Sequence, residues 1–133
     1  MQKNPVYTDL LSEVKSFLAE RARALTDLGV SAEKIVLDPG FGFGKTVSQN
    51  FELLAKTEDF LSLGYPLLYG MSRKSSLGAV TGITKAEERL ISSVTAHLLA
   101  VERGASIVRV HDVKQMKEAL TIYKAMVPYK DLK

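Results

Sequence analysis

The stretch Asp38-Pro39-Gly40-Phe41-Gly42-Phe43-Gly44-Lys45 decides the fold, because it directly follows the apolar run Ile35-Val36-Leu37. Three aliphatic residues suit a short buried strand, and the proline after Asp38, which has no N–H, ends the strand's hydrogen-bond ladder. Asp38 therefore stands at the carboxyl end of a predicted strand. The alternating glycines allow positive φ and close approach of a ligand, while Phe41 and Phe43 offer flat apolar faces. This stretch, residues 38–45, is called the glycine loop below. Its sequence favours a βα loop that binds a planar ligand; the alternative is a connection whose phenylalanines pack into the core.

Two nucleotide-binding glycine motifs fail here on spacing. A Walker loop has four residues between its first glycine and its Gly-Lys-Ser/Thr triplet, but the residue at that place before Gly44-Lys45-Thr46 is Pro39. A dinucleotide fingerprint needs a glycine three residues after its second, and after Gly42 that place is held by Lys45. The loop therefore does not predict a nucleotide site.

Length and composition restrict the class of protein. At 133 residues the chain suits one domain, which we expect to span 1–133. Hydrophobic residues make up 46% of the chain, and no apolar run reaches the roughly 18 residues of a membrane span. No secretory signal is evident either. We therefore expect a cytoplasmic protein with no membrane partner. The absence of cysteine excludes disulfides and thiolate metal sites. A net charge of +3 argues against a nucleic-acid partner.

Helical and strand patterns alternate along the chain. Strands are predicted at 35–37, 67–69 and 107–110. The predicted helices run from Thr8 or Asp9 to Leu28, from the glycine loop to Gly64, from the capping-box sequence Thr84-Lys85-Ala86-Glu87 to Arg103, and from Asp112 to Pro128, with a short helical turn after residue 75. One side of the second helix should carry Phe51, Leu54 and Leu61. The last helix should carry an apolar stripe of Val113, Met116, Leu120, Tyr123 and Val127.

The alternation brings charged side chains together. Strands that alternate with helices are parallel, and their carboxyl ends meet at the edge where barrels and open α/β sheets bind ligands. That edge collects Asp38, the loop Ser72-Arg73-Lys74-Ser75, Arg109 and His111-Asp112. Because Arg109 and His111 are two residues apart, their side chains point to the same face of the strand. With helix amides beginning at Val113, this pair favours a phosphate or diphosphate site.

Each of these residues also has a plainer interpretation. Arg109 alone fits a surface residue in a frayed strand, and Arg73 with Lys74 fits a solvated basic loop. Asp38 beside phenylalanines is costly unless it is paired, and a guanidine-like ring edge would supply the partner. His97, midway along a predicted helix, is interpreted as a packing or surface histidine.

Three segments together resemble the last three strand-loop signatures of the dihydropteroate synthase family, in the same order and spacing. They are Leu37-Asp38-Pro39-Gly40-Phe41-Gly42-Phe43-Gly44-Lys45, Gly70-Met71-Ser72-Arg73-Lys74-Ser75 and Arg109-Val110-His111-Asp112-Val113. The resemblance extends over the whole chain, and Met1-Gln2 is similar to the segment after that family's fifth strand. The family is a (β/α)₈ barrel of about 250 residues. The resemblance therefore implies an α/β fold of parallel βα units, the C-terminal portion of a TIM barrel with about three strands and four main helices.

The resemblance also implies an activity, a transferase step of folate biosynthesis. In that reaction 4-aminobenzoate attacks the methylene carbon of 6-hydroxymethyl-7,8-dihydropterin diphosphate, which gives 7,8-dihydropteroate and releases diphosphate. By the family's pattern, Asp38 and Lys74 would hydrogen-bond the pterin ring. Arg109 and His111 would hold the diphosphate and stabilise the charge that develops on it. Lys74, Arg109 and His111 are thus the expected catalytic residues.

Phe43 and Ser75 would line the 4-aminobenzoate site by the same pattern. The family's Mg²⁺ ligand, an asparagine of its first strand, has no counterpart in this sequence, nor do its two mobile loops. We therefore expect no metal ligand in this chain, although the full-length enzyme uses Mg²⁺, and we expect the chain alone to be inactive.

Strand parity leads to an expectation about assembly. Val36 shares a face with Asp38, and Ile107 shares one with Arg109, so both should point into the barrel interior, which five missing strands would leave uncovered. Unpaired strand edges add to this exposure, and we expect a homo-oligomer, for example a dimer. Two other functions stay open: a pterin-binding methyltransferase and a non-catalytic interaction piece. The Ser-Arg-Lys-Ser loop and the Arg109/His111 pair favour the synthase, because a methyltransferase's folate substrate carries no diphosphate.

Overall fold

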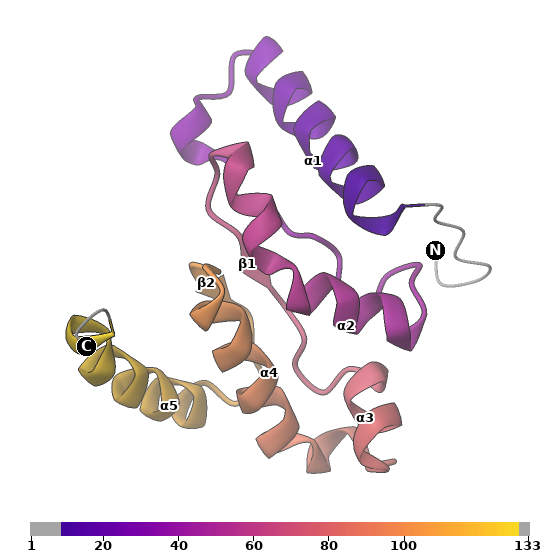
Figure 1. Ribbon diagram of the computed structural model, residues 1–133, viewed down its shortest axis with the longest axis vertical. Coiled ribbons are helices and arrows are strands. Elements are labelled where there is room, and N and C mark those ends of the chain that lie inside the picture. The colour runs from indigo at the N-terminus through magenta and orange to yellow at the C-terminus, as the bar shows by residue number, and fades with distance from the viewer. Residues whose placement is uncertain (1–8, 131–133) are drawn as a thin grey trace.

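The computed structural model describes residues 9–130, which form a mostly helical chain around two short parallel strands (Figure 1). The α-helices are α1 Leu10–Asp27, α2 Val47–Ala55, α3 Ser75–Thr81, α4 Leu90–Glu102 and α5 Val113–Met126. The strands are β1 Leu68–Tyr69 and β2 Ile107–Val108. Turns of 3₁₀-helix are η1 Ala32–Lys34, η2 Thr57–Leu63, η3 Ala86–Glu88 and η4 Val127–Tyr129. The expectations for Met1-Gln2 and Thr8 lie outside the described residues.

The strands are parallel, as the alternating pattern predicted, but they are shorter than expected. Leu68 pairs with Ile107 and Tyr69 with Val108, and Arg109 extends the ladder by one bond from its N–H to the Tyr69 carbonyl (2.9 Å). The strand expected at 35–37 is wrong in extent, since this segment contributes one parallel bridge, from Leu37 to Leu67. Pro39 cannot donate to a ladder, and this limits pairing beyond Leu37.

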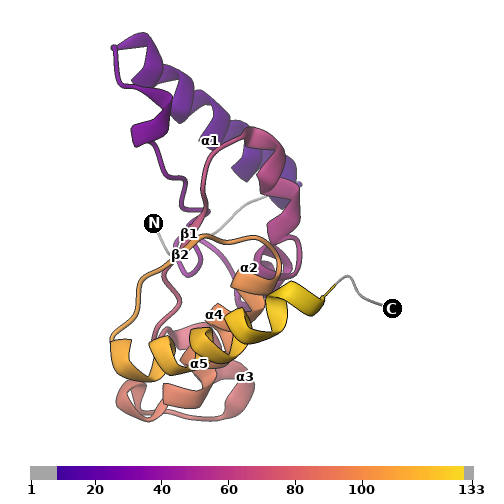
Figure 2. The same ribbon diagram turned by 90° about the vertical axis from the view of Figure 1, so that its left-hand side faces the viewer.

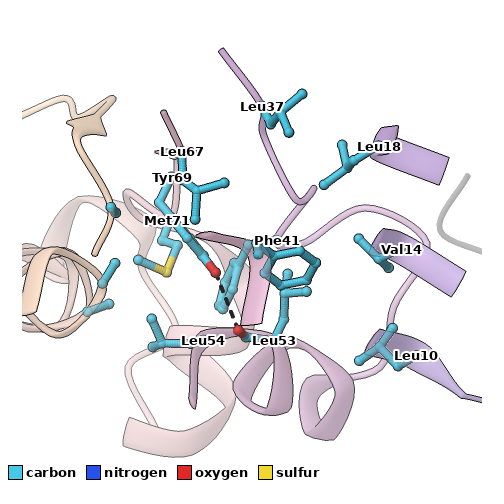
Figure 3. Close-up of a cluster of buried hydrophobic side chains, with 14 of the residues drawn as sticks. Leu10, Val14, Leu18, Leu37, Phe41, Leu53, Leu54, Leu67, Tyr69 and Met71 are labelled. Carbon is cyan, nitrogen blue, oxygen red and sulfur yellow. Dashed lines mark hydrogen bonds between the residues drawn. The ribbon is translucent and has the colours of Figure 1, made fainter. Parts of the chain in front are cut away.

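The first helix has the predicted ends and one buried face. The Asp9 carboxylate accepts a hydrogen bond from the Ser12 amide (3.3 Å), which makes it the N-cap, and Gly29 follows the C-cap with φ of +97°. Figure 3 shows how this face meets the strand ends and α2 in one apolar core. The side chains labelled there are Leu10, Val14, Leu18, Leu37, Phe41, Leu53, Leu54, Leu67, Tyr69 and Met71.

The second helix is not continuous to Gly64, which corrects the prediction. It ends at Ala55, and the chain continues as the 3₁₀ turn η2. At the break, the Thr57 hydroxyl donates to the Leu54 carbonyl (2.7 Å) and shares a hydrogen bond with the buried Tyr69 hydroxyl (2.8 Å). Burial raises the pKa of Tyr69 to about 12, so it stays protonated and joins β1 to the end of α2.

Two predicted helix caps are also wrong. The turn η3 begins after Lys85, and α4 begins after Arg89, with no side-chain cap on either, so Thr84 does not form a capping box. Asp112 is the N-cap residue of α5, but its carboxylate forms an ion pair with Arg73 (3.1 Å) instead of capping the helix. At Asp112 a long-range ion pair competes with the local pattern, while near Thr84 the Arg89 guanidinium binds the Thr84 carbonyl (3.1 Å).

One side of the short sheet is open. Val36 is 43% exposed and Ile107 is 40% exposed, as strand parity predicted.

The predicted stripe of α5 is wrong in part, because Met116 is buried while Val113 and Val127 are exposed. A groove of about 490 Å³ lies between the end of β2 and α5. Within 9–130, no helix combines the length and the apolar character that crossing a membrane requires.

His97 is a packing residue, in agreement with its interpretation from the sequence. Its fully buried ring accepts a hydrogen bond from the Met71 amide at Nε2 (3.0 Å), and its Nδ1 faces the Ser93 carbonyl (2.7 Å). These partners require a neutral ring that carries its proton on Nδ1. Burial lowers the pKa of His97 below its ordinary 6.5; the backbone hydrogen bonds oppose this effect, and Lys74 adds to it.

The lowered pKa predicts acid destabilisation. Since the unfolded histidine binds a proton more readily than the folded one, the free energy of unfolding should fall as the pH drops below about 6.5. We expect His97→Gln to be less stable by about 1–3 kcal/mol at pH 7, and to lose this slope. Urea unfolding between pH 7.5 and 5.5 measures both. His111→Gln, which keeps His97, is the matched control; an equal slope in parent and His97→Gln would contradict the assignment.

Candidate functional site

Charged side chains from two loops meet at the carboxyl ends of β1 and β2. They surround a hollow of about 400 Å³, which we name the strand-end hollow. It is lined by Gly70, Ser72, Lys74, Arg109, Val110 and His111. The structure thus brings together the three residues predicted to be catalytic.

Arg109 reaches the hollow across a glycine. A Cβ at position 70 would lie 2.6 Å from Nη2 of Arg109 and 2.9 Å from Nε, which is closer than van der Waals contact allows. Position 70 has no positive φ, so what it requires is space for the guanidinium. The first residue after β1 therefore leaves room for the arginine that follows the second strand.

His111 is fixed by a buried serine. The Ser72 hydroxyl lies 2.8 Å from Nδ1 of His111 and accepts a hydrogen bond from the His111 amide (3.1 Å). Ser72 is buried and comes from the loop after β1, so it joins the two loops. The His111 side chain is exposed, and Ser72 contacts its ring at the Nδ1 edge.

Lys74 connects this hollow to the glycine loop. Its ammonium donates to the Phe41 carbonyl (2.5 Å) and lies 4.2 Å from the centre of the Phe43 ring, a cation–π contact. Burial lowers the pKa of Lys74; Asp38 raises it in part, and Arg109 and Lys45 lower it further. A lysine surrounded in this way is positioned as a hydrogen-bond donor rather than left in solvent.

The glycine loop is fastened at both ends. The Asp38 carboxylate accepts from the Gly40 amide (2.9 Å), and the Lys45 ammonium donates to the carbonyls of Gly40 (2.9 Å) and Phe43 (3.0 Å). From α2, the buried Asn50 side chain accepts from the Gly42 amide (2.8 Å). The rest of Asp38 is exposed, so its carboxylate has free capacity to accept further hydrogen bonds.

The two phenylalanines of the loop have different places. Phe41 is 1% exposed and meets Phe51 edge to face at 6.1 Å, so the expectation that it offers a face to a ligand is wrong. Phe43 is 41% exposed and supports Lys74. The alternative interpretation, phenylalanine packed into the core, applies to Phe41 alone.

A second hollow, of about 510 Å³, lies between the glycine loop and α1, and we name it the glycine-loop hollow. Asp38, Phe43 and Lys45 line one side, and apolar residues of α1 such as Phe17 line the other. The two hollows adjoin at the Lys74–Phe43 contact. The site is therefore a polar compartment next to a mainly apolar one.

Two parts of the expected site are not built into either hollow. Ser75, the exposed first residue of α3, lines neither of them. Within residues 9–130, no group of three or more histidine, cysteine, aspartate or glutamate side chains is placed to hold a metal ion. Residues 9–130 therefore supply no ready ligand set for Mg²⁺.

Sequence reasoning placed Ser72 at this edge but missed what its side chain does, and it missed Asn50 altogether. Ser72 holds His111, and Asn50 ties Gly42 to α3 through a hydrogen bond from its amide to the Ser76 hydroxyl (2.9 Å). Asn50 is 26 residues from Ser76, and Ser72 is 39 from His111, so no local pattern reveals these pairs. One sequence feature could have identified Asn50: it is a polar residue beside the apolar face of the predicted helix.

Sequence and structure comparisons relate this chain to known proteins. Residues 1–111 match the family model described as pterin binding enzyme. The chain is 47% identical over 127 residues to dihydropteroate synthase from Neisseria meningitidis serogroup C, which covers 95% of this chain and 45% of that protein. It is similar to the crystal structure of dihydropteroate synthase from Stenotrophomonas maltophilia with active-site-bound imidazole (TM-score 0.93, 50% identity, 95% and 48% covered).

It is also similar to dihydropteroate synthase from Xanthomonas albilineans in complex with 7,8-dihydropteroate, with a TM-score of 0.91 and 44% identity over 95% of this chain and 48% of that one. The chain thus spans about half the length of the curated relatives it matches.

Proposed function

The chain belongs to the pterin-binding enzyme family, and on this premise we propose that it carries the pterin and diphosphate sites of a dihydropteroate synthase. The observation that carries the proposal is the strand-end hollow, in which Lys74, Arg109 and His111 converge from two loops. We further propose that residues 1–133 are a single partial domain, the last three βα units of a (β/α)₈ barrel. The Xanthomonas albilineans relative, whose structure holds 7,8-dihydropteroate, supports a pterin ligand.

The chemistry of the hollow suits a diphosphate leaving group. Arg109 supplies a guanidinium fork and His111 an imidazole edge, and groups fixed before reaction stabilise charge as it develops. Ser72 holds His111 before any ligand binds, and the absence of a side chain at Gly70 leaves room for the Arg109 guanidinium beside it. When the amine of 4-aminobenzoate attacks the methylene carbon, a C–N bond forms, the bond to the diphosphate oxygen breaks and the amine proton is lost to solvent; Arg109 and His111 stabilise the negative charge on the departing diphosphate.

The neighbouring residues suit the ring ends of the two substrates. The two carboxylate oxygens of Asp38 accept the paired N–H groups of a pterin edge, and Lys74 donates to a ring acceptor. Phe43 offers an exposed face beside Lys74, where we place 4-aminobenzoate with Ser75 at its rim. The two alternative functions explain less of the site. A methyltransferase would give the Arg109–His111 pair no diphosphate to bind, and a non-catalytic interaction piece would give the strand-end hollow no ligand.

We also propose the setting in which this site works. The absence of cysteine supports the cytoplasm. The exposed Val36 and Ile107 support a homo-oligomer, such as a dimer, that covers part of the open face. By itself, the 133-residue polypeptide should bind its ligands and show no turnover.

The proposal is tested by pterin binding. We expect 6-hydroxymethyl-7,8-dihydropterin, which carries no phosphate, to bind the chain, and Asp38→Asn to weaken it by about tenfold, because the amide cannot accept two hydrogen bonds in parallel. NMR titration of the backbone amides around Gly40 and Lys74 measures the affinity. Asp27→Asn, at the far end of α1, removes the same charge and should change nothing. Equal pterin affinity in parent and Asp38→Asn would contradict the ring site.

A further inference from the structure

Arg89, the residue before α4, has no place in the site described above, yet it is held by an unusual set of contacts. Its half-buried guanidinium donates to three backbone carbonyls: Nη1 to Arg73 (2.8 Å), Nε to Ile83 (3.0 Å) and Nη2 to Thr84 (3.1 Å). One side chain thus ties the loop that precedes α4 to the loop that follows β1. Figure 1 shows α3 and the start of α4 at the same end of the molecule, and Figure 2 shows the same arrangement from the side.

The carbonyl that Arg89 holds belongs to a strained residue. Arg73 has φ of +61°, and among the described residues it is the one non-glycine with positive φ. Such a conformation costs energy and persists where the surroundings enforce it. Here the Arg73 amide donates to the Ser93 hydroxyl (2.9 Å), and its side chain pairs with Asp112 (3.1 Å). The backbone of Arg73 is therefore held on both sides by the first turn of α4, through Ser93 and Arg89.

A glycine makes room for this contact. A Cβ on Gly78, within α3, would lie 2.6 Å from Cζ of Arg89. Position 78 has ordinary helical φ, so its conformation does not require glycine. Glycine is required at position 78 because the Arg89 guanidinium packs against α3 there.

The residues on either side of Arg73 are the ones that build the strand-end hollow. Ser72 bonds His111, and Lys74 reaches Phe41 and Phe43. We propose that Arg89 is a positioning residue for the anion site: by holding Arg73 in its left-handed conformation, it directs Ser72 toward His111 and Lys74 toward the glycine loop. This inference rests on the proposed function, and it adds a residue that touches no substrate.

The test compares Arg89→Met with Arg103→Met, using inorganic pyrophosphate as the probe. Both changes remove one positive charge beside α4, but the Arg103 guanidinium bonds the Leu99 carbonyl of its own helix (3.2 Å). We expect Arg89→Met to weaken pyrophosphate by about tenfold, the loss of one charge-assisted contact in the hollow. The amide resonances of Ser72, Arg73 and Lys74 should shift with it. Arg103→Met should match the parent in both measurements.

Gly78→Ala is the second variant, because it displaces the guanidinium and leaves Arg89 in the sequence. Alanine favours helix more than glycine does, so weaker binding could not come from a weaker α3. Gly78→Ala should weaken pyrophosphate binding as Arg89→Met does. Arg89→Lys, which has fewer donors than arginine, should recover part of the lost affinity. This graded order is not expected from a general loss of stability.

Each outcome decides the inference. Parent-like affinity and resonances in Arg89→Met would overturn it while leaving the proposed function intact. If the parent itself fails to bind pyrophosphate, the proposed function fails, and the resonances of Ser72, Arg73 and Lys74 then decide alone. If they are unchanged in Arg89→Met, Arg89 does not position this loop.

Discussion

Arg109→Ala should lower the affinity of this chain for inorganic pyrophosphate by about ten- to a hundredfold. Charge-assisted hydrogen bonds contribute about 1.5–3 kcal/mol, and Arg109 supplies the bidentate donor of the strand-end hollow. The guanidinium lies directly over Gly70 in the hollow, so its removal takes away a donor that faces the proposed ligand. Calorimetric or NMR titration at one fixed ionic strength measures the loss, since the salt concentration itself changes the affinity.

Two further variants separate position from charge. Arg21→Ala, on the exposed side of α1, removes the same charge outside the hollow and should leave the affinity unchanged. Gly70→Ala keeps Arg109 but makes its guanidinium shift, so it should weaken binding by less than removing the arginine does. If Arg21→Ala and Arg109→Ala weakened pyrophosphate equally, binding would reflect net charge and the hollow would not be the site.

Phe41→Ala should destabilise the protein by about 3–5 kcal/mol, while Phe43→Ala should change the free energy of unfolding by about 0.5 kcal/mol or less. The difference comes from burial. Phe41 is 1% exposed and packs edge to face against Phe51, so its removal leaves a cavity, whereas Phe43 is 41% exposed. Urea unfolding followed by circular dichroism measures both values.

The milder change Phe41→Leu guards against complete unfolding, because a loss of 3–5 kcal/mol is a large share of the stability of a small domain. It should fold, and it should be less stable than the parent by an amount between those of the two alanine variants. Phe43→Ala should instead alter the surroundings of Lys74, which loses its cation–π partner. Equal destabilisation by the two alanine changes would contradict the division of the loop into a core phenylalanine and a site phenylalanine.

Local signals identified most elements of this fold. The C-cap of α1 at Leu28, the end of α4 before Gly104 and the parallel order of the strands all lie where short-range patterns placed them. Parity correctly placed Arg109 and His111 on one hollow. These features depend on glycine conformation, capping and strand alternation, each of which acts within a few residues of sequence.

Sequence patterns alone were enough to place the glycine loop, Lys74 and the Arg109–His111 pair at one edge of the sheet, because each follows a segment that pairs in parallel. Only the tertiary structure decided which phenylalanine is buried, that Asp112 pairs with Arg73 instead of capping α5, and that Arg89 holds Arg73. The reason is physical: burial and long-range hydrogen bonds depend on which segments pack together, and partners 16 or 39 residues apart leave no periodic trace in the chain. Local patterns place residues along the chain, and packing determines what each of them contacts.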